Sequence, residues 1–271
     1  MTVNSYLTKL AREAINRGLK KKNIQRSIGS ITTKLDDYFE DSLRDHFLFG
    51  SYSRNTILPR IMDPYSDVDY MVVFENDGLR PQAYLERLRT FVTRHYPEKS
   101  IYKSNPTIVL ELNHIRFELV PAVRAFWNDY KIPARASNFN DWIGTNPTDF
   151  NSKLIDTNKK ENNLIKPLIR LVKYWNTCND SVFESYTLEQ AIVEQNYFTL
   201  RATGQAQLKD YFYKFMSNFD VEDAPQRCGR KIEQLHDLIS DAKRYGKKGW
   251  PDEAESVIRK LLPPVESLEF A

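Results

Sequence analysis

Several features that mark common protein classes are missing from this sequence. Only two of its 271 residues are cysteines, too few for a disulfide-stabilised scaffold or a four-cysteine metal site. No apolar run approaches the roughly 20 residues that a membrane-spanning helix needs. The N-terminal residues also lack the apolar core of a secretory signal. Together these absences predict a soluble, reduced, cytoplasmic protein that does not associate with membranes.

The glycine motifs of common nucleotide-binding folds are missing as well. There are 9 glycines against 15 tyrosines and 15 phenylalanines, and neither G-x-G-x-x-G nor a Walker A pattern occurs. The nucleophile-elbow pattern G-x-S-x-G is absent, and neither cysteine has a neighbouring base in the sequence. The sequence therefore gives no support to a Rossmann dinucleotide fold, a P-loop enzyme, or a hydrolase with a serine or cysteine nucleophile.

The charges of the chain nearly balance. Lys and Arg number 39 and Asp and Glu number 36, so the formal net charge is 39 − 36 = +3. A general nucleic-acid binder would carry a strongly basic field, so stable nucleic-acid binding is not expected. With 41% hydrophobic and 13% aromatic residues, the chain can bury a sizeable core and is not expected to be disordered.

Hydrophobic periodicity divides the chain into an α+β half and a helical half. Helical spacing predicts two helices within the first 45 residues and one at residues 81–96. Strands are predicted at residues 47–49, 67–74, 107–112 and 115–120. Further helices are predicted at residues 164–175, 186–193, 206–215, 229–245 and 252–262. We expect two domains, residues 1–145 and 146–271, with a cleft between them, and Trp175 and Leu188 in the core.

A hairpin is predicted where the third and fourth strands meet. A two-residue turn at residues 113–114 would place Glu111 opposite Arg116 and Val109 opposite Glu118. Arg116 is then expected to pair with Glu111 at the periphery, which leaves Glu118 deeper in the sheet. We expect Pro121 to end the second strand of this hairpin.

Three carboxylates lie in strands that are otherwise apolar. Asp67 and Asp69 are two residues apart, so their side chains point to one face of the strand. Crowded carboxylates are costly to bury unless a cation neutralises them, and oxygen-only ligands suit Mg²⁺. Glu118, between Phe117 and Leu119, could close a two-metal site. The alternative is that these acids face solvent on edge strands, and the D-x-D pattern alone leaves this open.

A possible phosphate site lies upstream of these carboxylates. Gly50 and Ser51 follow a predicted strand at a point where a helix would begin, and backbone N–H groups at a helix start can cradle phosphate. In order and spacing, residues 49–56, 66–69 and 117–122 resemble the nucleotidyltransferase superfamily that includes DNA polymerase β. The resemblance implies an α+β fold: a polymerase β-like core with a mixed sheet, followed by a C-terminal helical lobe, with the active site in the cleft between them.

The helical half narrows this resemblance. Residues 168–176 contain Lys173 in a lysine–tryptophan helix, and Ser-Tyr-x-Leu-Glu opens the next helix at Ser185 and Tyr186. This combination resembles the branch containing cyclic GMP-AMP synthase, oligoadenylate synthase and the bacterial cGAS/DncV-like nucleotidyltransferases. Without that resemblance, Lys173 would be assigned to a solvated helix face, Ser185 to an N-cap and Tyr186 to the core.

The resemblance assigns roles to these residues. It implies a donor NTP whose triphosphate is held by Gly50, Ser51, Lys173 and Ser185 and whose base stacks on Tyr186. It also implies that two Mg²⁺ ions, or Mn²⁺ in their place, are held by a second set of residues, Asp67, Asp69 and Glu118. Family members often carry Asp at the third position, and Glu118 is longer by one methylene group.

The implied product is a cyclic di- or trinucleotide made from NTPs without a template, which activates a separate effector protein in anti-phage signalling. Two alternatives stay open: a toxin-type nucleotidyltransferase with a protein or tRNA acceptor, and an inactive nucleotide-binding module that regulates a partner. Some relatives are conjugated to targets through a small C-terminal residue. The resemblance therefore also permits a regulatory or conjugating partner at Ala271.

Overall fold

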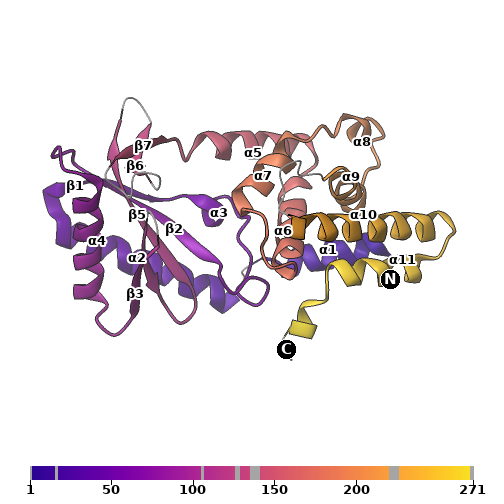
Figure 1. Ribbon diagram of the computed structural model, residues 1–271, viewed down its shortest axis with the longest axis horizontal. Helices are drawn as coiled ribbons and strands as arrows, with labels where there is room; N and C mark the ends of the chain where they lie inside the picture. The colour runs from indigo at the N-terminus through magenta and orange to yellow at the C-terminus, as the bar shows by residue number, and fades with distance from the viewer. Residues whose placement is uncertain are drawn as a thin grey trace. The chain divides into compact units, whose positions relative to one another are not determined.

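The computed structural model describes residues 2–15, 18–104, 107–125, 129–134, 141–219 and 226–268 of the chain (Figure 1). Its internal contacts divide the chain into two compact units. The sheet unit comprises residues 16–60 and 65–151, and the helical unit comprises residues 1–15, 61–64 and 152–271. The first 15 residues thus group with the C-terminal helices. The domain limits given above, 1–145 and 146–271, stay a prediction.

The sheet unit is a mixed sheet with accompanying helices. Its helices are α2 (Gly18–Phe39), α3 (Gly50–Ser53) and α4 (Pro81–His95), with the 3-10 turn η1 (Glu40–Ser42). Its strands are β1 (Leu43–Leu48), β2 (Asp67–Phe74), β3 (Ser100–Ser104), β4 (Thr107–Glu111), β5 (Arg116–Arg124), β6 (Tyr130–Pro133) and β7 (Trp142–Thr145). The described strands run in the order β1-β2-β5-β4-β3, with β6 beside β5 and β7 beside β6. β2 and β5 are parallel, and the other pairs are antiparallel.

One face of this sheet carries the core of the unit. Successive side chains of a strand alternate between the two faces, and Val68 of β2 stands beside Phe117 of β5. Both side chains are fully buried in a cluster with residues of α2 and α4, and Figure 1 shows α4 running beside the sheet. The positions that alternate with these two therefore face away from that core, and they include Asp67, Asp69 and Glu118.

The predicted hairpin between β4 and β5 is confirmed. A backbone hydrogen bond of 3.0 Å closes the two-residue turn. Glu111 stands opposite Arg116, and Val109 stands opposite Glu118. The register predicted from the turn length is therefore correct, and it fixes which face of the sheet Glu118 occupies.

The prediction that Pro121 ends the last strand is wrong, because β5 continues to Arg124. The antiparallel ladder with β4 reaches only as far as Leu119. Beyond that point Pro121 has a neighbouring strand on one side, where it stands beside Val72 of β2. A proline is tolerated at such a position because its missing N–H leaves no ladder partner unsatisfied on the open side.

Three of the described strands, β3, β6 and β7, were not predicted from the sequence. β1 begins at Leu43, four residues before its predicted start. β6 and β7 lie at the edge of the described sheet, and most of their side chains are exposed or half-buried. Such strands carry little of the apolar alternation on which a prediction depends.

The helical unit is built around α6. Its helices are α1 (Val3–Glu13), α5 (Asp149–Lys160), α6 (Ile165–Cys178), α7 (Ser185–Glu194), α8 (Phe198–Ala202), α9 (Leu208–Asn218), α10 (Gln226–Lys247) and α11 (Pro251–Leu261), with the 3-10 turn η3 (Val265–Leu268). α6 packs against α1, α7 and α9, and α1 also packs against α11. Trp175 on α6 and Leu188 on α7 are each 1% exposed, which confirms both as core residues.

The observed architecture confirms the predicted fold class, an α+β core with a mixed sheet together with a helical lobe. Within the described part of the chain, no helix is both long enough and apolar enough to cross a membrane.

Candidate active site

The turn after β1 brings Gly50 against Asp69. The Phe49 N–H donates to the Asp69 carbonyl at 3.1 Å, which ties the end of β1 to β2, and α3 then begins at Gly50. Gly50 has a φ of +65°, and a Cβ placed on it would lie 1.7 Å from Asp69 Oδ2. Only glycine fits here, because both its left-handed backbone and the space it leaves are required. The Asp69 carboxylate therefore lies directly over the start of α3.

The loop that follows is held by the carbonyls of this turn. The Gly50 carbonyl accepts from the Ser53 hydroxyl at 2.9 Å, and the Ser51 carbonyl accepts from the N–H groups of Thr56 and Ile57 at 2.9 and 3.1 Å. The amides of the first turn of a helix have no partner within the helix itself. The backbone thus presents N–H groups of Gly50 and Ser51 next to the Asp69 carboxylate.

Asp67 and Glu118 meet at one guanidinium. Arg116 stands directly opposite Asp67 in the parallel ladder, and its guanidinium donates to Asp67 Oδ2 at 3.0 Å and to the Tyr65 carbonyl at 2.7 Å. The same group lies 3.5 Å from Glu118 Oε1. The Thr107 hydroxyl donates to the other Glu118 oxygen at 3.4 Å. Two carboxylates from neighbouring strands therefore converge on a single cation.

The predicted pairing of Arg116 with Glu111 is wrong. Glu111 is paired with Arg60 instead. The β4–β5 register does place Glu111 opposite Arg116, but Asp67 stands opposite Arg116 on the other side. The guanidinium turns toward β2, where it contacts the Asp67 carboxylate and the Tyr65 carbonyl and stays near Glu118 of its own strand. Arg116 is thus the counter-charge of Asp67 and Glu118, and not of Glu111 as predicted.

The charges at this site shift the pKa values of their neighbours. Burial and the adjacent Asp67 carboxylate together raise the pKa of Glu118 to about 7, although Arg116 and the Thr107 hydroxyl act in the opposite direction. Burial acts to lower the pKa of Arg116, but its hydrogen bond to Asp67 and the negative charges of Asp67 and Glu118 act together in the other direction, and the pKa lies above its ordinary value. The site is therefore short of positive charge.

The three predicted metal ligands are only partly brought together. Asp67 and Glu118 share Arg116, while the Asp69 carboxylate lies against Gly50. Among the residues that the structure describes, no three His, Cys, Asp or Glu side chains are grouped to hold a metal. The assignment of Asp67, Asp69 and Glu118 as a set of metal ligands stays a prediction.

The predicted donor-binding residues of the helical half lie on α6 and α7. Ser185 and Tyr186 begin α7 and are exposed, Tyr186 to 46%. Lys173 is different, because it is 5% exposed and its ammonium group lies 3.3 Å from the fully buried Glu189 carboxylate. No role for Glu189 was predicted from the sequence. Glu189 lies four residues after Ser185, on the same helix face, and this spacing could have indicated a role for it beside the predicted donor-binding residues.

Comparison with known proteins identifies the family. Residues 1–158, more than half of the chain, match the Second Messenger Oligonucleotide or Dinucleotide Synthetase domain. The chain belongs to this family, and its resemblance to the bacterial cGAS/DncV-like nucleotidyltransferases is confirmed.

Two curated relatives match part of the chain. A probable cyclic nucleotide synthase of Bacillus cereus is 26% identical over 205 residues, which are 60% of this chain and 60% of that protein. A cyclic AMP-AMP-AMP synthase of an Acinetobacter species is 27% identical over 136 residues, 48% of this chain and 38% of that protein. The chain thus matches about two fifths to three fifths of the length of these relatives.

The fold also matches solved structures. One is the CD-NTase CdnG of Bradyrhizobium diazoefficiens, solved in complex with GTP, which superposes with a TM-score of 0.68 at 12% sequence identity. The match covers 98% of this chain and 99% of that one. At this identity the similarity concerns the fold.

Replacing Gly50 by alanine tests the contact with Asp69. Gly78 is the matched control, because it has a similar φ of +70° but a Cβ there would meet nothing within 4 Å. Both substitutions lose about 1–2 kcal/mol of unfolding free energy to the left-handed backbone. Gly50→Ala is expected to lose a further ~1–3 kcal/mol because the carboxylate must move. Urea denaturation followed by circular dichroism measures both, and equal losses would contradict the contact.

A second comparison tests how Arg116 stabilises the sheet unit. Arg116→Met leaves Asp67 and Glu118 half-buried without their cation, and we expect it to lower the unfolding free energy by about 1–3 kcal/mol. Arg44→Met removes an exposed partner of Glu75, 3.3 Å away, and should cost ~0–1 kcal/mol. The two are compared by urea denaturation at pH 7.5. A loss at Arg116 no larger than that at Arg44 would exclude it as the counter-charge of the site.

Proposed function

We propose that the chain transfers nucleotidyl groups from NTPs to ribose hydroxyls and so makes a cyclic di- or trinucleotide without a template. One observation carries the proposal: Asp67 and Glu118 converge on the Arg116 guanidinium on the face of the sheet that points away from α2 and α4, in a unit where the Asp69 carboxylate lies over the start of α3. The family to which the chain belongs is named for oligonucleotide and dinucleotide synthesis, and the names of the two curated relatives agree with it.

The acidic residues suit Mg²⁺, with Mn²⁺ as an alternative. Asp67 and Glu118 already direct carboxylate oxygens at one cation, the Arg116 guanidinium, and hard divalent ions prefer such oxygen ligands. We assign two ions to Asp67, Asp69 and Glu118. When bound, they would lower the pKa of the attacking hydroxyl and stabilise the leaving pyrophosphate.

The residues of the sheet unit have separate tasks in this proposal. Gly50 leaves the space that the Asp69 carboxylate occupies, and the N–H groups of Gly50 and Ser51 bind phosphate oxygens of the donor. Thr107 holds one oxygen of Glu118. Glu118 or a neighbouring group accepts the proton that the attacking hydroxyl loses.

The residues of the helical unit bind the donor NTP. Ser185 offers a hydroxyl to the triphosphate, and Tyr186 offers an exposed ring on which the base stacks. Lys173 supplies positive charge for the triphosphate. Before the NTP binds, Glu189 holds the Lys173 ammonium group in place. Ground-state binding of the donor is thus assigned mainly to α6 and α7.

The product of this reaction would be a second messenger that activates a separate effector protein in anti-phage signalling within the cytoplasm. The substrates are free NTPs, and the nearly balanced charge of the chain gives a long nucleic acid little to bind. A regulatory or conjugating partner at the C-terminus is a further prediction from the resemblance, and Ala271 lies outside the described residues.

Incubation of the pure protein with all four NTPs and Mg²⁺, followed by mass analysis, tests this function. A cyclic oligonucleotide is expected. Labelling of added protein or tRNA would indicate a toxin-type enzyme, and unchanged NTPs would indicate an inactive module.

Asp67→Asn combined with Asp69→Asn should abolish the product while the circular dichroism spectrum is kept. Asp77→Asn, which affects an exposed ion pair with Arg87 at 2.9 Å, should leave the rate unchanged. Wild-type turnover by the double variant would contradict the metal assignment.

Steady-state kinetics test the donor site on α7. Ser185→Ala and Tyr186→Ala should raise the KM for NTP more than they lower kcat, because both residues bind the ground state and the transition state alike. A stacking contribution of ~1–3 kcal/mol predicts a roughly 5- to 150-fold higher KM for Tyr186→Ala. Phe198→Ala, at an aromatic residue 62% exposed on α8, is the control. An unchanged KM in both α7 variants would remove α7 from the donor site.

Lys173 is a poor choice for the same kinetic test. Its removal would leave the Glu189 carboxylate buried without its partner, which typically costs about 3–5 kcal/mol of stability. A kinetic defect of such a variant would then reflect misfolding as much as lost binding.

A further inference from the structure

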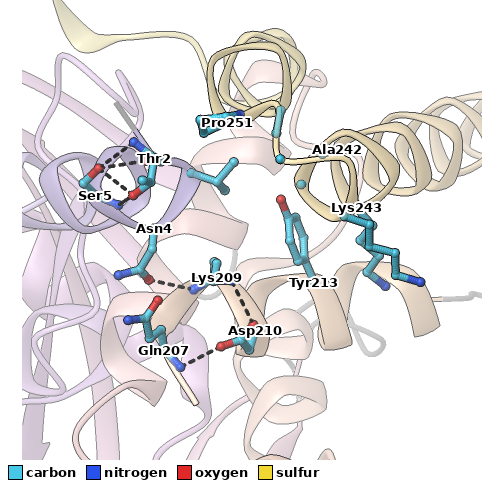
Figure 2. Close-up of a pocket in the computed structure, with 15 residues that line it drawn as sticks. Thr2, Asn4, Ser5, Gln207, Lys209, Asp210, Tyr213, Ala242, Lys243 and Pro251 are labelled. Carbon is cyan, nitrogen blue, oxygen red and sulfur yellow. Dashed lines mark hydrogen bonds and ion pairs between the residues drawn. The ribbon is translucent and has the colours of Figure 1, made fainter. Parts of the chain in front are cut away.

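A pocket of about 800 Å³ opens among four helices of the helical unit (Figure 2). The N-terminal turns of α1, α9 and α11 and the C-terminal part of α10 supply its walls. α1 and α10 each pack against both α9 and α11, so the four helices frame the pocket. Its volume is that of a site for a small organic molecule. None of the catalytic or donor-binding residues assigned above lines it.

Small residues keep this pocket open. Gly246 and Gly249 line it, and a Cβ added to either would meet nothing within 4 Å. Across the pocket, the Lys209 N–H donates to the Asn4 side-chain oxygen at 3.2 Å, which fastens α1 to α9 (Figure 2). The space is therefore framed by fixed backbone and is not filled by long side chains.

The charge on the pocket walls is positive. Three lysines and one aspartate line it, which gives 3 − 1 = +2. The aspartate, Asp210, lies 3.7 Å from the Lys209 ammonium group. Lys243 and Lys247 are one turn apart on α10 and share a helix face, and within the described part of the chain neither forms an ion pair with a carboxylate. α1 also has no acidic residue in its first turn that would offset the positive end of its dipole.

A simpler explanation accounts for only part of this charge. Basic side chains are common in the last turn of a helix, where they stabilise its negative end, and Lys247 fits that role. Lys243 lies one turn earlier, is half-buried, and donates to the Ser217 hydroxyl at 2.7 Å. Burial and the neighbouring Lys247 lower its pKa. Its charge is therefore held at a cost that an anion in the pocket would relieve.

Tyr213 gives the pocket a non-polar wall with one hydrogen-bond donor. Figure 2 shows its ring edge and hydroxyl directed into the pocket, and the Lys243 ammonium group lies 5.7 Å from the ring centre. Burial and the charge of Asp210 raise its pKa to about 12, so the hydroxyl stays protonated at neutral pH. This hydroxyl makes no hydrogen bond to another described residue. Pro251 continues the non-polar wall.

We propose that this pocket binds a small phosphorylated organic molecule. The phosphate lies at Lys243 and Lys247, and the non-polar part of the ligand lies against the ring of Tyr213. Lysines bind phosphate as compact point charges. No arginine is among the lining residues described. This binding does not depend on the proposed nucleotidyl transfer.

Calorimetry with phenyl phosphate in metal-free buffer tests the site. Gly246→Leu places a bulky side chain in the pocket and keeps the charge of all its lysines. Gly229→Leu is the matched control, since Gly229 lies on the same helix, has equally open space around it and is outside the pocket. Wild type and Gly229→Leu should bind with the same Kd, and Gly246→Leu at least tenfold more weakly. The double variant Lys243→Gln with Lys247→Gln should also bind at least tenfold more weakly, which keeps the test valid if Gly246→Leu does not fold.

Further arms separate this site from other sources of binding. Asp67→Asn with Asp69→Asn should bind phenyl phosphate as wild type does, which distinguishes the pocket from the candidate active site. Benzoate and inorganic phosphate should each bind at least tenfold more weakly than phenyl phosphate. No measurable binding to the wild type, wild-type affinity in folded Gly246→Leu, or benzoate binding as tight as that of phenyl phosphate would overturn the proposal. Equal binding of inorganic phosphate would overturn its organic part.

Discussion

The parallel pairing of β2 with β5 is the constraint on which the candidate active site depends. In this register Asp67 stands beside Arg116 and Asp69 beside Glu118. Since one face of both strands packs on the helices, all four side chains are placed on the other. A slip of one residue would send the carboxylates into the apolar core, where their burial would be prohibitive. The apolar residues that alternate with the acidic ones therefore determine on which face of the sheet the carboxylates lie.

Glycine and arginine each meet a need that this pairing creates. Crowding three carboxylates onto one face demands space and positive charge. Gly50 provides the space for Asp69, because no side chain fits beneath that carboxylate. Arg116 provides the charge for Asp67 and Glu118. Contacts within the chain thus hold these side chains in place.

The sequence revealed the parts of this site that follow from local spacing. The period of two along a strand placed Asp67 and Asp69 on one face, and the two-residue turn fixed the register of Glu118. The partner of Arg116 was missed because it comes from β2, 49 residues away in the chain, and no local pattern encodes a parallel pairing of that kind. The continuation of β5 beyond Pro121 was missed for the same reason, since it depends on where β4 stops.

In the helical half, too, local spacing predicted some features, and others depend on contacts between helices. Apolar spacing was enough to predict Trp175 and Leu188 as buried, yet it gave no sign that Lys173 is buried too. A lysine is normally solvated, and only the folded packing of α6 on α7 brings Glu189 within 3.3 Å of its ammonium group. Ser185 and Tyr186 stay exposed one turn away. The buried pair therefore joins the two helices just below the surface that those residues occupy.

The grouping of α1 with the helical unit has a consequence for synthesis on the ribosome. α1 is translated before the other described helices, but it packs against α6, α9 and α11, and the Tyr6 hydroxyl donates to the Leu262 carbonyl, 256 residues later in the chain. The apolar stripe that includes Leu7 and Leu10 therefore stays uncovered until α11 has been synthesised. The sheet unit is nearly continuous in sequence and can fold in the meantime. Synthesis from the N-terminus thus favours folding of the sheet unit first. The helical unit, to which α1 belongs, is completed only when α10 and α11 have been synthesised.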